Sequence, residues 1–312
     1  MAMTLNEKVV FVAGGSSGIG LAIARAARLA GARVAIASRD GAKVRAAFAH
    51  LGNEAGQVEG FQVDVTDRVA MNALADEVER NFGRIHILIN NAGTGILVPV
   101  ARATYNDWDW ALDVNVRGVA NGIQSFLPKI LSHNEEGHIV STASMAGLFV
   151  GGSAGLYCAT KYAVVGMMEA LRADLAPRNV GVSVFCPGLV RTEFYKCEEG
   201  RPERYAEPDR KLSEGSKARI QQRLASAMDP REAAQAVIRG VERNDLYILT
   251  HAEFAAGVRE RFEAILAAFP TPDTAPGDRV SAEQSAGLLS NPIYRGAPSG
   301  TSSPVSLQNT GR

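Results

Sequence analysis

The sequence has few cysteines and no net charge, and each deficit excludes a class of protein. Three cysteines occur among the 312 residues, Cys158, Cys186 and Cys197, and no two of them form a Cys-x-x-Cys pair. Neither a cysteine zinc site nor a disulfide framework is therefore expected, and a reducing cytoplasm is the simplest environment for the chain. Basic and acidic residues each number 33. A neutral chain lacks the basic surface that binds nucleic acid or an anionic membrane, so neither is expected as a partner.

Long apolar runs are also missing. No stretch reaches the roughly 18 consecutive apolar residues that a membrane-spanning helix needs. Residues 1–8 contain no basic segment before an apolar run, and the first such run, Val9–Ala13, is too short for a signal peptide. The five histidines show no metal-ligand spacing. The sequence thus predicts a cytoplasmic protein without a membrane anchor or a metal site.

The chain does contain enough apolar sequence for a large core. Hydrophobic residues make up 46% and charged residues 21%, which is usual for a soluble globular protein. Residues 1–270 suit one large α/β domain. Residues 271–312 are rich in proline, serine and glycine, and this composition predicts a disordered tail.

Short apolar runs alternate with helical patterns along most of the chain. The runs suit strands buried on both faces, and they are Val9–Ala13, Arg33–Ser38, Gly60–Asp64, Ile85–Ile89, His138–Thr142, Val180–Phe185 and Leu246–Thr250. Helices are expected over Leu21–Ala30, Met71–Phe82, Pro230–Arg243 and Glu253–Phe269. The alternation predicts an α/β, Rossmann-like, doubly wound fold with a seven-stranded, mostly parallel sheet and helices on both faces. A charged insertion at about 189–228 is expected over the sheet edge.

A glycine-rich turn follows the first predicted strand. Residues 13–20 read Ala-Gly-Gly-Ser-Ser-Gly-Ile-Gly, in which Gly14, Gly18 and Gly20 have the spacing Gly-x-x-x-Gly-x-Gly. Glycine lets the backbone approach a pyrophosphate, and the next helix offers free N–H groups and the positive end of its dipole. The same residues could form a tight turn without a ligand. The strand–turn–helix setting nevertheless favours a dinucleotide site.

The ends of the next two strands bear on the choice of dinucleotide. An acid at the end of the second strand would bind the ribose 2′-OH, but this sequence has Ser38 and Arg39. Because a guanidinium takes a phosphate bidentately, NADP(H) is expected in preference to NAD(H). NAD(H) stays an alternative, since Arg39 could be a solvated loop charge and Asp40 is adjacent. Asp64 and Val65 can receive an adenine, or form part of a helix cap.

Ser144, Tyr157 and Lys161 have the spacing Ser-x12-Tyr-x3-Lys. Tyr157 and Lys161 share one face of a helix because they are four residues apart. Ser144 follows a predicted strand at the carboxyl edge of the sheet, where ligands bind in such folds. Alone, a helical tyrosine one turn before a lysine is usually a packed ring beside a solvated amine. Together with the glycine turn and Asn90–Gly93, the three residues predict a catalytic site.

In these residues the chain resembles the short-chain dehydrogenase/reductase family, in its single-domain branch, over about residues 6–250. The shared positions are Gly14, Gly18, Gly20, Asp64, Asn90–Gly93, Asn115, Ser144, Tyr157, Lys161, Pro187, Gly188 and Thr192. Ala13 departs from the family, which usually has a threonine whose hydroxyl ties the glycine turn to the Asn-Ala-Gly segment. A looser turn with retained activity is expected from this difference.

The resemblance implies an oxidoreductase that acts on CH–OH groups. Tyr157 would exchange a proton with the substrate oxygen, Ser144 would donate a hydrogen bond to it, and Asn115 would bend its helix and hold a water leading to Lys161. All four would be catalytic residues. The implied cofactor contacts are Gly14, Ser16, Ser17, Gly18, Ile19, Gly20, Ser38, Arg39, Asp64, Val65, Asn91, Ala92, Gly93, Tyr157, Lys161, Pro187, Gly188, Val190 and Thr192.

The proton transfer sets a requirement on the pKa of Tyr157. A Lys161 ammonium about 4 Å from the phenol would favour the phenolate by roughly 4 kcal/mol at an effective dielectric of about 20. This corresponds to a phenol pKa about three units below its usual value, and burial would offset part of the shift. The sequence therefore predicts a phenol made more acidic by its neighbour.

The expected substrate is a hydrophobic ketone or secondary alcohol, and an aromatic one is among the candidates. The candidate lining is mostly apolar and comprises Ile96, Leu97, Met145, Phe149, Val150, Leu189, Phe194 and Tyr195. Residues 104–123 and 245–269 also resemble bacterial short-chain dehydrogenases that act on aryl alcohols of lignin fragments, a group that tends to use NAD. The second stretch contains Thr250-His-Ala-Glu-Phe254.

Two other interpretations stay open. One is a 3-oxoacyl-(acyl-carrier-protein) reductase, in which Lys129 and Arg172 would meet an acidic carrier. The other is a non-catalytic NADP(H) sensor, against which the intact Ser144, Tyr157 and Lys161 argue. The family resemblance also implies a homodimer or homotetramer, assembled through the helices expected at 108–131 and 155–175.

Overall fold

The computed structural model describes residues 3–52, 56–151, 154–208, 213–270, 276–287 and 289–294. The strands are β1 (Val9–Ala13), β2 (Arg33–Ser38), β3 (Val58–Gln62), β4 (Ile87–Asn90), β5 (Gly137–Thr142), β6 (Val180–Cys186) and β7 (Tyr247–Leu249). The α-helices are α1 (Gly18–Leu29), α2 (Gly41–Leu51), α3 (Arg68–Phe82), α4 (Tyr105–Leu112), α5 (Gly118–Ser132), α6 (Gly155–Asp174), α7 (Glu214–Ala225), α8 (Pro230–Arg243), α9 (Ala255–Ala267) and α10 (Gly277–Ser285).

The strands form one parallel sheet in the order β3-β2-β1-β4-β5-β6-β7. The order changes direction between β1 and β4, where Ala13 pairs with Asn90 at the carboxyl end. Doubly wound sheets bind ligands in the crevice outside this switch point. The predicted Rossmann-like fold class is therefore confirmed, and the sheet is parallel at each pairing in the described residues.

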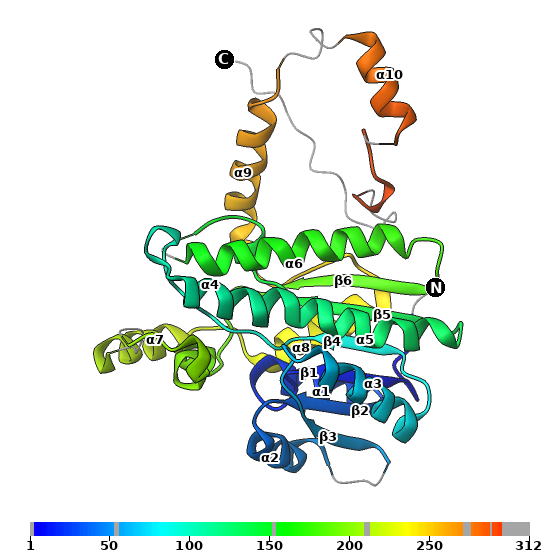
Figure 1. Ribbon diagram of the computed structural model, residues 1–312, viewed down its shortest axis with the longest axis vertical. Coiled ribbons are helices and arrows are strands. Elements are labelled where there is room, and N and C mark those ends of the chain that lie inside the picture. The colour runs from blue at the N-terminus through cyan, green and yellow to red at the C-terminus, as the bar shows by residue number, and fades with distance from the viewer. Residues whose placement is uncertain are drawn as a thin grey trace. The chain divides into compact units, whose positions relative to one another are not determined.

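Helices cover both faces of the sheet (Figure 1). Successive strand residues point to opposite faces, so Val10 and Val12 pack with α1, α2 and α8, whereas Val9 and Phe11 pack with α3, α5 and α6. Phe11 stacks on Phe126 of α5 with ring centroids 4.1 Å apart. The two cores hold the sheet rigid and thereby fix the positions of its carboxyl-edge loops.

Several predicted boundaries agree with the structure and others shift by a few residues. The helix predicted at Pro230–Arg243 is α8 itself. The third strand ends at Gln62, so Asp64 lies in the loop beyond it rather than at its last position. The helix predicted over Glu253–Phe269 runs from Ala255 to Ala267. These shifts leave each predicted site residue on the same edge of the sheet.

One predicted helix proves to be composite. Between α4 and α5 the backbone forms a π-helical turn at Asp113–Arg117, with Asn115 buried at its centre. A π-helical turn inserts one extra residue per turn and often marks a functional site. The direction in which Asn115 points therefore depends on the π-helical turn, which the α-helical spacing of the sequence does not reveal.

The charged insertion contains 3-10 turns at Phe194–Gly200 and Glu203–Tyr205, followed by α7. Arg201 anchors it to α4, because its guanidinium binds the fully buried carboxylate of Asp107 at 2.8 Å and lies 4.5 Å from the Trp110 ring. Asp107 also accepts the backbone N–H of Thr104 in a capping box at the start of α4. Burial of both charges with several hydrogen bonds fixes this part of the insertion on the domain.

The chain divides into two compact units, Met1–Ala268 and Phe269–Arg312. In the second unit, where the sequence predicts disorder, the structure has α10 and a 3-10 turn at Pro292–Tyr294, and the rest of the predicted tail lies largely outside the described residues.

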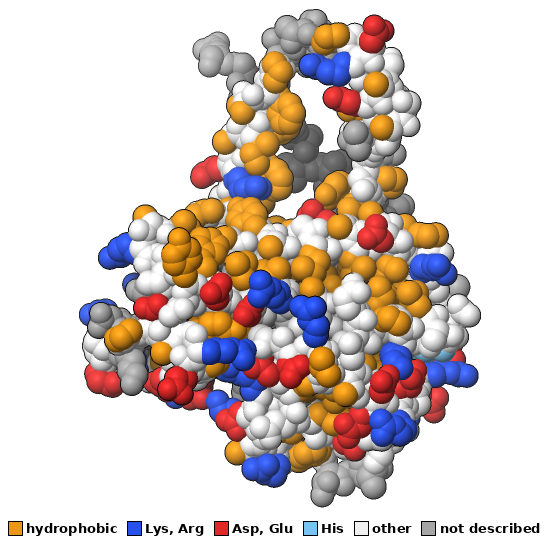
Figure 2. Space-filling model, viewed as in Figure 1, with side chains coloured by type: hydrophobic (Ala, Val, Ile, Leu, Met, Phe, Trp, Pro, Cys, Tyr) orange, Lys and Arg blue, Asp and Glu red, His pale blue; other side chains and the backbone are white. Residues whose placement is uncertain are grey.

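Hydrophobic side chains lie along α9 (Figure 2), with Phe262, Ile265 and Leu266 exposed. Among the described residues, no helix combines the length and apolar character needed to cross a bilayer.

A buried histidine in β5 makes the stability of the fold depend on pH. Ser183 donates its hydroxyl hydrogen to the carbonyl of Asp245, so the Nε2 atom of His138 must donate to Ser183 Oγ, at 2.8 Å. Burial, followed by the charge of Arg172, lowers the pKa of His138 to about 3. His138 is therefore neutral in the folded protein at pH values where the unfolded chain binds a proton.

Acid should consequently destabilise the protein through His138. Because the folded pKa is depressed, stability falls as the pH drops below about 6.5, by about 2 kcal/mol at pH 5 from this group. Urea unfolding at pH 7 and pH 5 tests this: His138→Gln should lose about 2 kcal/mol less than the wild type over this range. The exposed His50→Gln should behave as the wild type. An equal acid loss in His138→Gln would contradict the assignment.

Candidate active site

The glycine turn forms a cradle, defined here as residues 14–20, between β1 and α1. Gly14 and Gly18 have positive φ angles of 76° and 53°. A Cβ atom on Gly14 would lie 2.8 Å from the Ala92 backbone, and one on Gly20 would lie 2.1 Å from the Gly14 carbonyl oxygen. The N-cap residue Ser17 makes no side-chain cap to α1. The glycines therefore let the turn pack on the neighbouring backbone, and the first N–H groups of α1, which lack a side-chain cap from Ser17, suit an anion.

Asn91 ties this cradle to the neighbouring strands. Its backbone N–H donates to Ala13 O at 3.0 Å, and its Nδ2 donates to Gly14 O at 3.3 Å. Its Oδ1 accepts from Thr142 Oγ1 at 3.1 Å. These bonds connect the glycine turn to the Asn-Ala-Gly segment despite the alanine at position 13. That the alanine at position 13 makes the turn looser stays a prediction.

The same chain of hydrogen bonds ends at Lys161. Its Nζ donates to Thr142 O at 2.9 Å and lies 5.5 Å from the centroid of the Tyr157 ring. The Lys161 side chain is buried, with the residue only 4% exposed. The lysine is accordingly held between the end of β5 and the aromatic ring one helical turn earlier on α6.

Ser144 completes the predicted group. It lies at the start of the loop after β5, where its Oγ accepts from Ala146 N at 3.1 Å and donates to Pro187 O at 3.4 Å. Ser144 also lies close enough to the phenol of Tyr157 to act on it, in the direction that lowers the phenol pKa. The structure thus brings together Ser144, Tyr157 and Lys161, as the spacing predicts.

The predicted direction of the Tyr157 pKa shift is wrong. Burial raises the pKa of Tyr157 above its usual value, and this effect exceeds the opposing effect of Ser144. Burial also lowers the pKa of Lys161 to about 8. The amine faces the ring of Tyr157 and bonds to Thr142, so it does not act on the phenol as the short Coulomb pair that the sequence argument assumes. Desolvation therefore decides both values.

Asn115 lies behind this group. From the π-helical turn, its Nδ2 donates to Thr94 O at 2.9 Å and to Thr160 Oγ1 at 3.1 Å, and its Oδ1 accepts from Thr94 N at 2.8 Å. Thr160 in turn donates to the backbone carbonyl of Tyr157 at 2.8 Å. A Cβ atom on Gly93 would lie 3.3 Å from Asn115 Oδ1 and 3.7 Å from Lys161 Nζ. Asn115 therefore joins the segment after β4 to the turn of α6 that carries Tyr157.

The structure shows the contacts of the charged residues at the ends of β2 and β3. Asp40 caps α2, because its Oδ1 accepts from the backbone N–H groups of residues 42 and 43 at 2.9 and 3.1 Å. Asp67, not Asp64, caps α3, and Asp64 Oδ1 instead accepts from Thr66 N at 2.9 Å. Arg39 is exposed and donates to the carbonyl of Gly200 at 3.0 Å. The insertion thus reaches the edge at which Ser38 and Arg39 lie.

The loop from Pro187 to Thr192 lies across the same edge. The Pro187 carbonyl accepts from Met145 N at 2.9 Å, which links the loop to the segment that carries Ser144. Val190 is buried and forms a parallel bridge with Met228. A Cβ atom on Gly18 would lie 3.2 Å from Thr192 Cγ2, so the loop ends at the glycine cradle.

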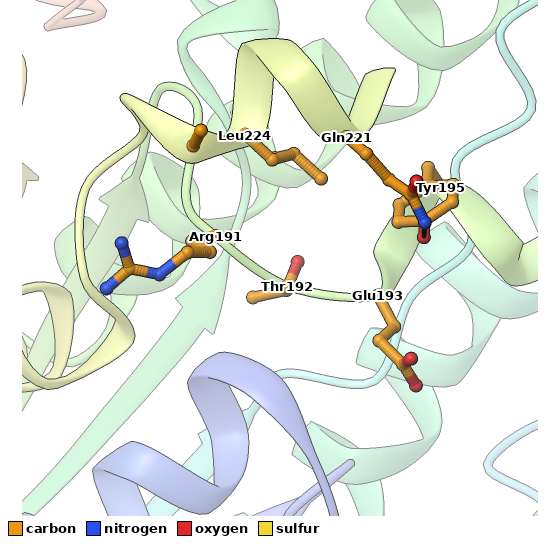
Figure 3. Close-up of a pocket in the computed structure, with 7 residues that line it drawn as sticks. Arg191, Thr192, Glu193, Tyr195, Gln221 and Leu224 are labelled. Carbon is orange, nitrogen blue, oxygen red and sulfur yellow. Dashed lines mark hydrogen bonds between the residues drawn. The ribbon is translucent and has the colours of Figure 1, made fainter. Parts of the chain in front are cut away.

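A cavity of about 320 Å³ adjoins this loop. Figure 3 shows Thr192 and Glu193 on the loop and Gln221 and Leu224 on α7 around the same hollow. Tyr195 also lines it and accepts a hydrogen bond from Gln221 at 3.0 Å. The helix of the insertion therefore forms one wall of a space that begins beside the cradle.

The predicted substrate-lining residues divide into two groups. Ile96 is fully buried in a cluster with Trp110, and Met145 is in the core, so neither is a lining residue. The others are partly or largely exposed and remain candidates: Leu97, Phe149, Val150, Leu189, Phe194 and Tyr195. Phe194 approaches the Tyr157 ring edge-on at 6.1 Å, and Phe149 lies 5.7 Å from Phe254.

Sequence reasoning assigned no role to Phe254, His251 or Arg204, which the structure places beside predicted site residues. The rings of His251 and Phe254 lie against Gly188. Arg204 donates to Thr66 at 3.0 Å and lies 3.8 Å from the Asp64 carboxylate. Phe254 and His251 belong to the Thr250–Phe254 motif. Their contact with Gly188 joins segments more than sixty residues apart in the sequence, and such a contact leaves no periodic pattern.

Comparison with known proteins assigns the family. The family model described as short chain dehydrogenase matches residues 8–201. The C alpha-dehydrogenase of Sphingobium sp. strain SYK-6 is 34% identical over 262 residues, 84% of this chain and 86% of that protein. D-threitol dehydrogenase of Mycolicibacterium smegmatis is 38% identical over 190 residues, 61% and 73% of the two chains. A short chain dehydrogenase/reductase from Burkholderia phymatum in complex with NAD has a TM-score of 0.80 at 34% identity, covering 88% of this chain and 99% of that one.

The fold and the site define an α/β oxidoreductase with its reactive groups at the carboxyl edge of a parallel sheet. The match over residues 8–201 and the similarity to these relatives specify it further. The chain belongs to the short chain dehydrogenase family. The family resemblance and the enzyme class predicted from the sequence are therefore confirmed.

Removal of the Asn115 amide should destabilise the fold. Asn115→Ala leaves the buried N–H and carbonyl of Thr94 without these partners, so the free energy of unfolding should fall by about 2–4 kcal/mol. Arg117→Ala in the same π-helical turn removes an exposed arginine and should cost less than about 0.5 kcal/mol. Urea unfolding at pH 7 measures both. An Asn115→Ala protein as stable as Arg117→Ala would show that the amide network contributes little.

Proposed function

We propose that this chain is an NADP(H)-dependent oxidoreductase that interconverts a hydrophobic, aryl-substituted ketone and its secondary alcohol, with Tyr157 as the acid and base. One observation carries the proposal. The phenol of Tyr157, the hydroxyl of Ser144 and the buried amine of Lys161 lie together at the sheet edge that also holds the glycine cradle.

The residues at this edge fit a nicotinamide dinucleotide. The glycines let the turn pack directly on the backbone of the Asn-Ala-Gly segment, and the start of α1 offers its N–H groups to a pyrophosphate. In this proposal the pyrophosphate is bound by Gly14, Ser16, Ser17, Gly18, Ile19 and Gly20; the adenosine by Ser38, Arg39, Asp64, Val65, Asn91, Ala92 and Gly93; and the nicotinamide riboside by Tyr157, Lys161, Pro187, Gly188, Val190 and Thr192. A bound dinucleotide supplies or takes up the hydride.

Tyr157 is suited to the proton transfer. Since burial raises its pKa, the phenol keeps its proton at neutral pH and can donate it to a ketone oxygen during reduction. The Ser144 hydroxyl favours the phenolate that forms, and the Lys161 amine lies 5.5 Å from the centroid of the same ring. Ser144 would also stabilise negative charge on the substrate oxygen. Oxidation requires the phenol to lose its proton first, so higher pH favours that direction.

The preference for NADP(H) rests on Arg39. Its guanidinium is exposed at the end of β2, and one of its five N–H donors binds the Gly200 carbonyl. Asp40 does not compete for a ribose, because its carboxylate caps α2. A cationic group without a competing acid at this position favours a 2′-phosphate over a 2′-hydroxyl.

The aromatic rings beside Tyr157 support an aryl substrate. Phe194 and Tyr157 meet edge-on, and Phe149 and Phe254 form a second pair near the loop that carries Ser144. Leu97, Val150 and Leu189 add exposed apolar side chains. Aromatic rings favour edge-to-face contact with another ring, so an aryl ketone gains more here than a small charged one.

A substrate panel tests the function. With NADPH, aryl ketones should show higher kcat/KM than aliphatic ketones, small keto acids or 3-oxoacyl thioesters. Tyr157→Phe removes the transferred proton and should lower kcat by roughly 10²–10⁴, whereas the loss of its one contact with the nicotinamide riboside should raise the Kd for NADPH by less than about tenfold. Tyr162→Phe, on the same helix, is the matched control and should retain activity. Turnover confined to keto acids or thioesters, or full activity in Tyr157→Phe, would contradict the proposal.

The cofactor preference has its own test. Arg39→Ala should lower kcat/KM for NADPH at least about tenfold, because a charge-assisted contact with the 2′-phosphate is lost, and should change the value for NADH little. Arg25→Ala removes an exposed arginine from α1 and serves as control. A wild-type enzyme that prefers NADH, or an Arg39→Ala variant with unchanged preference, would refute the assignment.

The pH profile of ketone reduction reports on Lys161. Its amine is charged below about pH 8 and neutral above, so kcat/KM should fall as the pH rises through about 8. Lys161→Arg keeps the charge at all accessible pH values and should lose this decline, although its rate is lower. Lys43→Arg, an exposed lysine on α2, should keep the wild-type profile. A wild-type profile that is flat from pH 7 to pH 10, or the same decline in Lys161→Arg, would argue against this role.

A further inference from the structure

His251 follows β7 and contacts the loop that crosses the sheet edge. Its Nδ1 accepts from the backbone N–H of Gly188 at 3.1 Å, and its Nε2 lies 3.2 Å from the carbonyl oxygen of Leu189. A Cβ atom on Gly188 would lie 2.7 Å from the imidazole and 2.8 Å from the ring of Phe254. The two rings therefore pack directly on the glycine backbone.

The two backbone partners fix the tautomer of His251. An amide N–H can only donate, so Nδ1 must present its lone pair to Gly188. A carbonyl can only accept, so Nε2 must carry the hydrogen toward Leu189. The side chain of Thr250 lies 2.8 Å from Nδ1 and can donate to the same lone pair. A single neutral tautomer satisfies these contacts, which marks a built arrangement.

Other contacts hold the same loop. Met145 N donates to Pro187 O at 2.9 Å, and Met228 N donates to Leu189 O at 3.2 Å. His251 binds the same two peptide groups: the Gly188 N–H belongs to the peptide whose carbonyl accepts from Met145, and the Leu189 carbonyl accepts from both Met228 and His251. Its partner Phe254 also packs against Phe149, in the segment that follows Ser144. A displaced imidazole would therefore leave the Gly188 N–H without its bond to His251 and the Leu189 carbonyl with only the bond from Met228.

We propose that His251 is a positioning residue, which holds the Gly188–Leu189 backbone where the nicotinamide half of the dinucleotide binds. The inference rests on the proposed function for the role of this loop. It goes further because His251 lies outside residues 8–201, the part of the chain that the family model matches. In this proposal the segment after β7 supports the cofactor site as well as the core of the fold.

The test separates the two halves of the cofactor. ADP-ribose, or its 2′-phosphate, contains the adenosine and pyrophosphate but no nicotinamide. Isothermal titration calorimetry first measures which dinucleotide the wild type binds more tightly. If it is NADPH, the Kd of NADPH is compared with the Kd of the 2′-phosphate of ADP-ribose; if it is NADH, the Kd of NADH is compared with that of ADP-ribose. In His251→Ala the dinucleotide Kd should rise about tenfold, whereas the Kd of the matching fragment should stay within about twofold of the wild type. A general loss of folding would weaken both ligands alike.

Two conservative variants divide the contacts. His251→Asn keeps an acceptor near the Nδ1 position for Gly188, and His251→Gln keeps a donor near the Nε2 position for Leu189. At least one of them should recover most of the dinucleotide affinity. His50→Ala, an exposed histidine at the end of α2, is the matched control and should bind both ligands as the wild type does.

Distinct results overturn the inference and the function on which it rests. Unchanged dinucleotide affinity in His251→Ala, equal loss of dinucleotide and fragment, or no recovery in either conservative variant would each overturn the positioning role. These measurements need no ketone, so an error in the substrate class does not affect them. A wild-type protein that binds neither NADPH nor NADH would overturn the proposed function and this inference together.

Discussion

Burial of the Lys161 ammonium group is the constraint on which the site depends. A charged amine that is withdrawn from water needs compensating polar partners, and here Thr142 O accepts its hydrogen bond while the Tyr157 ring lies 5.5 Å away. Desolvation still lowers the pKa of Lys161 to about 8. The group is therefore held close to the point at which its charge is lost, beside the phenol that we propose transfers the proton.

The surrounding structure keeps that amine in place. Thr142 is bound to Asn91, Asn91 to the glycine turn, and Asn115 to both the segment after β4 and the turn of α6 that carries Tyr157. The contacts of Asn91 lie at the ends of strands in one parallel sheet, and those of Asn115 reach a helix that packs on the sheet, so the packing of the core sets their spacing. The insertion, which Arg201 anchors to α4, and the segment after β7 then add walls to this edge through Phe194 and Phe254. A rigid sheet positions the polar groups, and the later segments shape the space around them.

The sequence predicts much of this arrangement because it depends on local patterns. Buried β-branched runs predict the strands, helical spacing places Tyr157 and Lys161 on one face, and glycine marks the turn that no side chain can occupy. Asp40 shows the limit of such reasoning. The sequence shows that it follows Arg39, but only the local backbone and side-chain conformation show that its carboxylate caps α2.

The features that the sequence does not predict depend on packing between distant segments. The π-helical turn at Asn115 is a backbone feature that an α-helical repeat conceals. The raised pKa of Tyr157 follows from desolvation, which only the assembled core determines. The contact of His251 with Gly188 joins residues 63 positions apart, and Ile96 proves to be core because Trp110 packs on it.

The state of the Lys161 amine can be measured directly. In protein labelled with 13C at the lysine ε-carbon, NMR titration should show one signal with a midpoint near pH 8, and that signal should be missing from Lys161→Arg. Such a resonance would establish a buried ammonium poised to lose its charge beside the phenol. A Lys161 signal that titrates with the solvent-exposed lysines above about pH 10 would contradict the account.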